Sequence, residues 1–109
     1  MAENILDLYA LAKHQIDEVY PAVHNPRLFI GVLKLIERIH TELSQIQGQD
    51  QQRLKEIKDI LKKYEESNTN FPRDDQIIIA DGDFELHKIT LAYVEEVLKE
   101  TKVLIDNMH

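Results

Sequence analysis

The chain has 109 residues, of which 43% are hydrophobic and 30% are charged. This composition is typical of a folded domain, and the length is typical of one domain, so we expect residues 1–109 to form a single domain. The absence of cysteine excludes disulfides, thiolate nucleophiles and cysteine-based metal centres. The formal net charge of -7 disfavours contact with a phosphate backbone, so we expect no direct binding to nucleic acid.

Apolar runs in the sequence are short. The longest spans residues 28–33, far below the roughly 20 residues that cross a bilayer. The first residues include acidic side chains and lack the basic and apolar pattern of a secretory signal. We therefore expect a soluble, cytoplasmic protein with no membrane insertion.

Apolar residues recur every three or four positions in four segments, which is the period of an amphipathic helix. The first segment covers residues 5–20 and is predicted to stop at Pro21, whose ring clashes with the preceding helical turn. The second follows Asn25 and Pro26, which are typical of a helix N-cap and of the first helical position. It is expected to end at Gly48.

The third apolar stripe covers residues 54–64, and the fourth helix is predicted from residue 83 to residue 107. Thr90 and Thr101 fall near the middle of the apolar face of the fourth helix. Each hydroxyl can donate to a carbonyl of its own preceding turn, so we expect both side chains to be buried without another partner.

Residues 67–83 interrupt the helical period with Asn, Pro and Asp-Gly signals around Ile77, Ile78 and Ile79. A long loop, a short helix and a short strand are all compatible with this segment, and we favour a loop with one helical turn. The predicted fold is therefore all-α: an antiparallel (up-down) four-helix bundle with a long loop between helices 3 and 4, and one shared core.

Glu37 and His40 have the Glu-x-x-His spacing that di-iron helical bundles use for metal ligands. Such sites need two copies of the pair, and the sequence contains one. A metal-binding or catalytic bundle would require a further carboxylate, such as Glu96 or Glu100. We expect no metal, no cofactor and no enzymatic activity, and we keep the Glu37 and His40 site as the alternative.

The second helix is apolar beyond one stripe, because Ile30 and Leu33 project on the flank away from its main apolar face. One explanation is that this helix is the most enclosed of the four. The other is a partner or homodimer surface that includes Ile30 and Leu33, with Leu11 as a further candidate.

Residues 71–85 combine apolar side chains with acidic neighbours, an arrangement that suits docking to a basic and partly hydrophobic protein. The predicted partner-binding residues of this segment are Phe71, Asp74, Asp75, Ile77, Ile79, Asp81 and Asp83. The alternative is that the isoleucines fold onto the bundle while the acids face water.

These patterns favour a small non-catalytic helical-bundle protein that acts through protein-protein binding, as an adaptor, a chaperone-like factor, or an inhibitor or immunity-type module. The expected partner is another protein, with a basic one the easiest to accommodate. Two alternatives stay open, namely the metal-binding or catalytic bundle that uses Glu37 and His40, and a homodimeric structural module.

Overall fold

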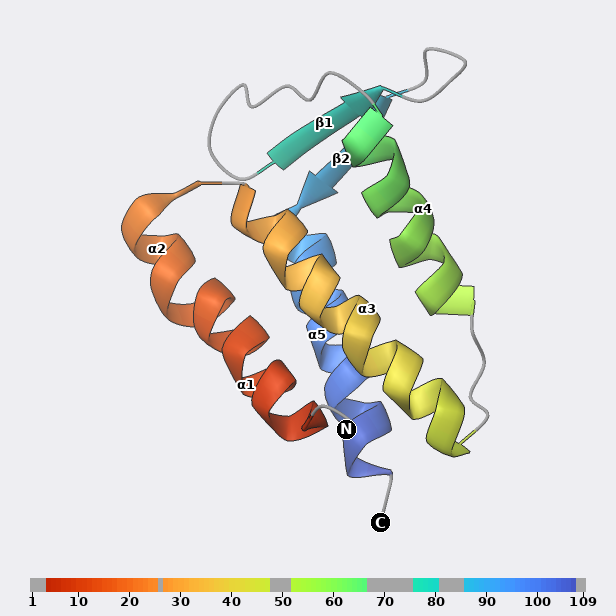
Figure 1. Ribbon diagram of the computed structural model, residues 1–109. Coiled ribbons are helices and arrows are strands. Elements are labelled where there is room, and N and C mark those ends of the chain that lie inside the picture. The colour runs from red at the N-terminus through yellow and green to blue at the C-terminus, as the bar shows by residue number, and fades with distance from the viewer. Residues whose placement is uncertain (1–3, 26, 48–51, 67–75, 81–85, 108–109) are drawn as a thin grey trace.

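The computed structural model describes residues 4–25, 27–47, 52–66, 76–80 and 86–107. The described residues are predominantly helical, as predicted (Figure 1). The elements in chain order are α1 (Ile5–His14), a π-helical turn (Gln15–Val19), α2 (Tyr20–Val23), α3 (Arg27–Gln47), α4 (Gln52–Glu66), β1 (Gln76–Ala80), β2 (Leu86–Thr90) and α5 (Leu91–Asp106). Within these residues, no helix combines the length and apolarity that crossing a membrane requires.

The first helical segment does not stop at Pro21, which corrects the prediction from sequence. It passes from α1 through the π-helical turn into α2, with Pro21 in the first turn of α2. In the π-helical turn, the amide of Tyr20 bonds to the carbonyl of Gln15, five residues earlier. A wider turn directly before the proline relaxes the backbone spacing that makes proline incompatible with a regular helix interior. The segment ends at His24, which has a left-handed backbone conformation with a φ of 51°.

Side-chain caps define where three of the helices begin. Asn4 accepts a hydrogen bond from the amide of Leu6 at 2.9 Å, and Asn25 accepts one from the amide of Arg27 at 3.0 Å. The second contact confirms the predicted N-cap at Asn25. Thr90 caps α5 by accepting from the amide of Tyr93 at 3.1 Å, so its hydroxyl does not have the buried, back-bonded role predicted for it.

Helix α3 is the central element of the fold. It contacts α1, α4 and α5, while α1 also contacts α5. Figure 1 shows α3 between α1 and α4. The side chains of α3 buried by these contacts are Phe29, Ile30, Val32, Leu33, Ile36, Ile39, His40 and Leu43. Burying several large apolar side chains, each contributing about 1.5–3 kcal/mol, makes α3 the main source of hydrophobic stabilisation.

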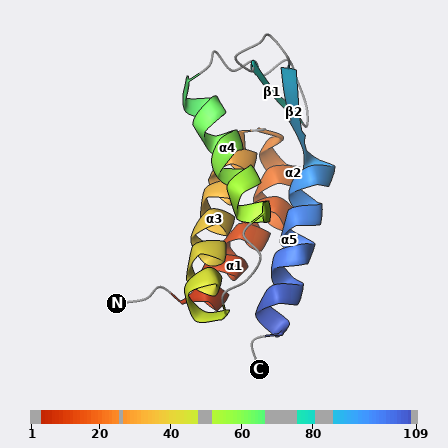
Figure 2. The same ribbon diagram turned by 90° about the vertical axis from the view of Figure 1, so that its right-hand side faces the viewer.

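Residues 76–80 and 86–90 form an antiparallel two-stranded hairpin at the end of the helices where α3 begins (Figures 1 and 2). Ile77 pairs with Ile89, and Ile79 pairs with His87. Of the three alternatives for the isoleucine run, the strand is the one adopted, and α5 begins at Leu91 rather than near residue 83. Three consecutive β-branched residues favour an extended backbone at residues 77–79. The apolar residues Leu86 and Ile89 have the spacing of a helix, but pairing with β1 makes residues 86–90 a strand.

The buried residues form two clusters rather than the single core expected from sequence. Ile16, Leu61 and Val97 belong to the larger cluster, which also includes Ile89 of β2. Ile39 belongs to a smaller cluster with Ile5, Leu43 and Ile105. The partly buried Tyr9 packs against both clusters, so it links them across the interior.

Replacing Leu33 with Ala should lower the free energy of unfolding by about 2–5 kcal/mol, because it removes a fully buried side chain and leaves a cavity in the larger core cluster. Leu11→Ala is the matched control, since Leu11 is 47% exposed and should change stability by less than about 0.5 kcal/mol. Urea denaturation followed by circular dichroism measures both. An equal effect of the two substitutions would contradict the central position of α3.

Candidate functional site

The two residues predicted to form a partner surface on the second helix are buried in α3. Ile30 is 4% exposed and Leu33 is 0% exposed, and both belong to the larger core cluster. This corrects the expectation of a partner or homodimer surface at these positions. The apolar face of α3 is wide because α3 is enclosed by three other helices.

Most of the predicted acidic docking segment lies outside the described residues. This applies to Phe71, Asp74, Asp75, Asp81 and Asp83. Ile77 and Ile79 lie on β1, where the backbone register alone is described. The binding of a basic partner by this segment therefore stays a prediction from the sequence.

Glu37 and His40 lie in different surroundings and do not form one site. His40 is 5% exposed, and its Nε2 lies 3.0 Å from the hydroxyl of Thr101 on α5. Glu37 is half-buried and lines a different surface, between α3 and α4. Among the described residues, no three His, Asp or Glu side chains are grouped so that they could hold a metal ion. The alternative metal site thus lacks a ligand set in this part of the chain.

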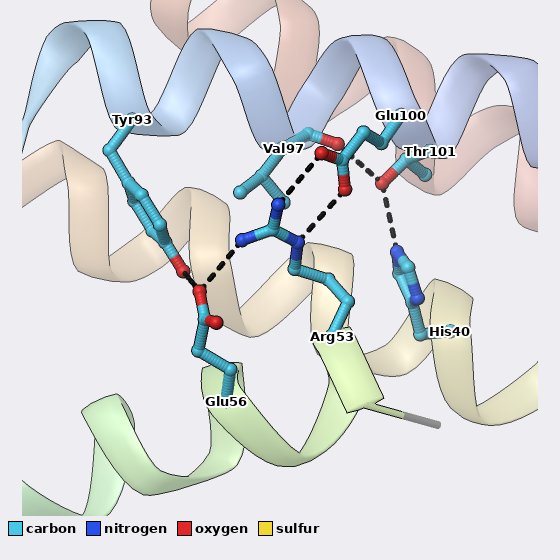
Figure 3. A network of polar contacts seen from close by, with 7 residues as sticks. All are labelled: His40, Arg53, Glu56, Tyr93, Val97, Glu100 and Thr101. Carbon is cyan, nitrogen blue, oxygen red and sulfur yellow. Dashed lines mark hydrogen bonds and ion pairs between the residues drawn. The ribbon is translucent and has the colours of Figure 1, made fainter. Parts of the chain in front are cut away.

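A network of charged and hydrogen-bonded side chains joins α4 to α5 (Figure 3). Arg53 of α4 donates two parallel hydrogen bonds to Glu100 of α5, from Nε at 2.9 Å and from Nη2 at 2.7 Å. Its Nη1 donates to Glu56 at 2.7 Å, and Glu56 also accepts a hydrogen bond from the hydroxyl of Tyr93 at 2.5 Å. The guanidinium carbon lies 5.7 Å from the centre of the Tyr93 ring. Arg53 is therefore held by contacts to both helices.

The surroundings of Arg53 and Tyr93 raise the pKa values of both groups, so both keep their protons near neutral pH. The hydrogen bond to Glu100 raises the pKa of Arg53, and the charges of Glu100 and Glu56 add to the effect. Burial raises the pKa of Tyr93, and the hydrogen bond to Glu56 raises it further. A phenol that stays protonated and a guanidinium that stays charged are suited to fixing the position of two helices, and they are poor proton donors or acceptors near neutral pH.

A second, buried chain of hydrogen bonds joins α3 to α5. The hydroxyl of Thr101 donates to the carbonyl of Val97 at 2.8 Å, which confirms the predicted bond to its own preceding turn. Since that hydroxyl has one hydrogen, the His40 contact requires Nε2–H to donate to Thr101, so His40 carries a proton on Nε2. Burial lowers the pKa of His40, and the positive charge of Arg53 lowers it further.

An open groove of about 400 Å³ lies beside the Arg53 network, between α4 and the junction of β2 with α5. We call it the α4–α5 groove, and its lining residues are Gln52, Lys55, Glu56, Asp59, Ile60, Lys63, Ile89 and Tyr93. Ile60 and Ile89 are buried and contribute apolar surface at its base. Lys55, Asp59 and Lys63 follow one another every four residues along α4 and give the groove a rim of both charges.

Sequence reasoning did not identify Arg53 or Tyr93 as interacting residues. Arg53 lies at the start of a helix whose many charges resemble a solvated surface, and Tyr93 fits the apolar stripe of α5. Glu100 was considered only as a carboxylate for a metal. No signal along the chain links positions 53 and 100, because their contact arises only when α4 and α5 are brought together.

Comparison of the chain with protein-family models, with curated proteins and with solved structures found no match.

The free energy of unfolding should fall as the pH is lowered below about 6.5, the ordinary pKa of histidine, because His40 binds a proton more readily in the unfolded chain than in the fold. Its contribution is complete above that pH and is lost as the pH falls through the lower, folded-state pKa. In His40→Gln, an amide can still donate to Thr101 but does not titrate. Urea denaturation at a series of pH values should show a shallower slope for this variant, and identical slopes would contradict the assignment.

A double-mutant cycle with Arg53→Met and Glu100→Gln should give a coupling energy of about 1 kcal/mol, because the ion pair is bidentate and Arg53 is partly buried. The pair of Lys102 and Asp106, which is exposed and four residues apart on α5, is the matched control and should give about 0.3–0.5 kcal/mol. Thermal or urea denaturation of the single and double variants measures both. A coupling energy no larger than that of the control would show that the network does not help to hold α4 against α5.

Proposed function

We propose that this chain is an up-down four-helix bundle that acts without catalysis, through protein-protein contact, and that its α4–α5 groove receives an amphipathic helix of a partner protein. The observation that carries the proposal is the groove itself, an apolar base with a charged rim beside a pair of helices held together by polar side chains. Grooves of this kind accept one apolar face of a helix, which is a recurring mode of protein recognition.

The base of the α4–α5 groove supports an apolar anchor. Ile60, Ile89 and the ring of Tyr93 supply carbon surface to the groove, and its volume of about 400 Å³ suits one or two apolar side chains rather than a whole domain. Interfaces gain most of their binding energy from a few such anchors at their centre.

The rim supports a partner of mixed charge. Gln52, Asp59 and Lys63 line the groove over three turns of α4, which is about 16 Å at 1.5 Å per residue. Lys55 and Lys63 are cationic and Asp59 is anionic, so a partner helix with both charges beside its apolar residues is the best complement. We infer that the partner presents apolar residues three or four positions apart, flanked by charged ones.

Two further proposals depend on the sequence. The acidic segment of residues 71–85 is proposed as an additional contact for a basic partner, and a cytoplasmic location is proposed from the short apolar runs of the sequence. In the metal-binding alternative at Glu37 and His40, a metal ion would have to bind Nδ1 of His40, because Nε2 is used in the bond to Thr101. Elemental analysis of the purified protein distinguishes it, because stoichiometric iron, manganese or zinc would favour that alternative.

Helical peptides selected from a random library for binding to the protein should lose at least about tenfold in affinity for Asp59→Trp, because the indole ring occupies the groove. Glu95→Trp is the matched control. Glu95 lines a different groove, between α5 and α1, so this substitution should leave the affinity within about twofold. Isothermal titration with the best peptide measures both.

Equal losses in the two variants, or selected peptides without a spaced apolar pattern, would contradict the α4–α5 groove as the binding site.

A further inference from the structure

A second groove lies on the other flank of α4, between α4 and α3, with a volume of about 390 Å³. We call it the basic groove, and its lining residues are Lys34, Glu37 and Arg38 from α3 and Lys58, Leu61, Lys62 and Glu65 from α4. Four of these residues are cationic and two are anionic. This local excess of positive charge stands out in a chain whose formal net charge is -7.

The sequence of α3 or of α4 taken alone does not reveal this excess of positive charge. On α4, Lys58 and Lys62 alternate with acidic residues and resemble a solvated ridge, while α3 carries a similar number of acids and bases. The packing of α3 against α4 places the two sets of cations along one groove. Within the described residues, Lys34, Lys58 and Lys62 form none of the ion pairs that join charged side chains elsewhere in the structure.

The cations are spaced by one helical turn on each side. Lys34 and Arg38 are four residues apart on α3, and Lys58 and Lys62 are four residues apart on α4. Four residues of helix rise by about 6 Å, which is also the separation of two carboxylates four residues apart on another helix. A helix lying along the groove could therefore place two carboxylates within reach of cations on both walls.

We propose that the basic groove binds an acidic helical segment of a partner protein, with carboxylates one turn apart. A protein segment fits better than nucleic acid. Affinity for a phosphate backbone comes from many cationic contacts, whereas the groove offers a few and the rest of the chain is strongly acidic. Glu37 and Glu65 would also repel a compact ligand of high negative charge, but they can pair with a single basic residue that stands among the carboxylates of such a segment.

This proposal shares no lining residue with the α4–α5 groove, so either site can fail while the other holds. The probe for the basic groove is a fluorescently labelled helical peptide with pairs of Glu four residues apart, and binding is measured by anisotropy at low salt. Wild type should bind it, and a peptide with Gln in place of every Glu should bind at least about tenfold more weakly.

The combination of Lys58→Glu and Lys62→Glu should weaken binding of the Glu peptide by at least about tenfold, because two attractive contacts become repulsive. The matched control combines Lys99→Glu with Lys102→Glu. These residues are exposed on α5, and their replacement adds the same negative charge to the chain. The control should weaken binding by less than about threefold, through long-range repulsion alone. Circular dichroism checks that all variants fold.

Three outcomes would overturn the proposal. One is equal weakening in the two double variants, which would mean that the net charge governs binding. Another is no binding of the Glu peptide to wild type. The third is tighter binding of a single-stranded oligonucleotide of the same charge than of the peptide, which would identify the basic groove as a nucleic-acid site.

Discussion

The burial of α3 against three other helices is the constraint on which the rest of the structure depends. Its apolar side chains point toward α1, α4 and α5, and Phe29 also packs against Tyr20 of α2 at a ring separation of 5.0 Å. Because α3 supplies residues to both buried clusters, it holds together the two parts of the interior. The positions of the surrounding helices, and of the grooves between them, follow from how each one docks on α3.

Helix α4 illustrates this dependence. Its apolar residues Leu54, Ile57 and Leu61 are buried, and the side chains of Arg53 and Glu56 add polar contacts to α5. Each flank of α4 borders a groove, one toward α5 and one toward α3. Both proposed binding sites therefore belong to α4, one with an apolar base and the other with an excess of cations.

The buried pair of His40 and Thr101 places a polar contact among the apolar side chains that fill most of the interior in the described part of the chain. Its members lie on α3 and α5, and both hydrogen-bonding atoms have partners. A buried polar pair of this kind contributes little net stability when it is satisfied, but it penalises other alignments of the two helices that would leave one partner unsatisfied. The same burial explains why protonation of His40 opposes folding.

The sequence by itself determined the helical character, the approximate extent of the first three helices and the N-cap at Asn25, because these depend on local periodicity and on capping chemistry. It also predicted the bond from Thr101 to its own turn. Only the tertiary structure decided the hairpin, the continuation of the first helix past Pro21 and the enclosure of Ile30 and Leu33. It likewise decided the two grooves and the contact of Arg53 with Glu100. The continuation past Pro21 depends on the π-helical turn directly before it. The other features join positions that are distant in the chain, so they depend on packing, which local patterns of residues do not encode.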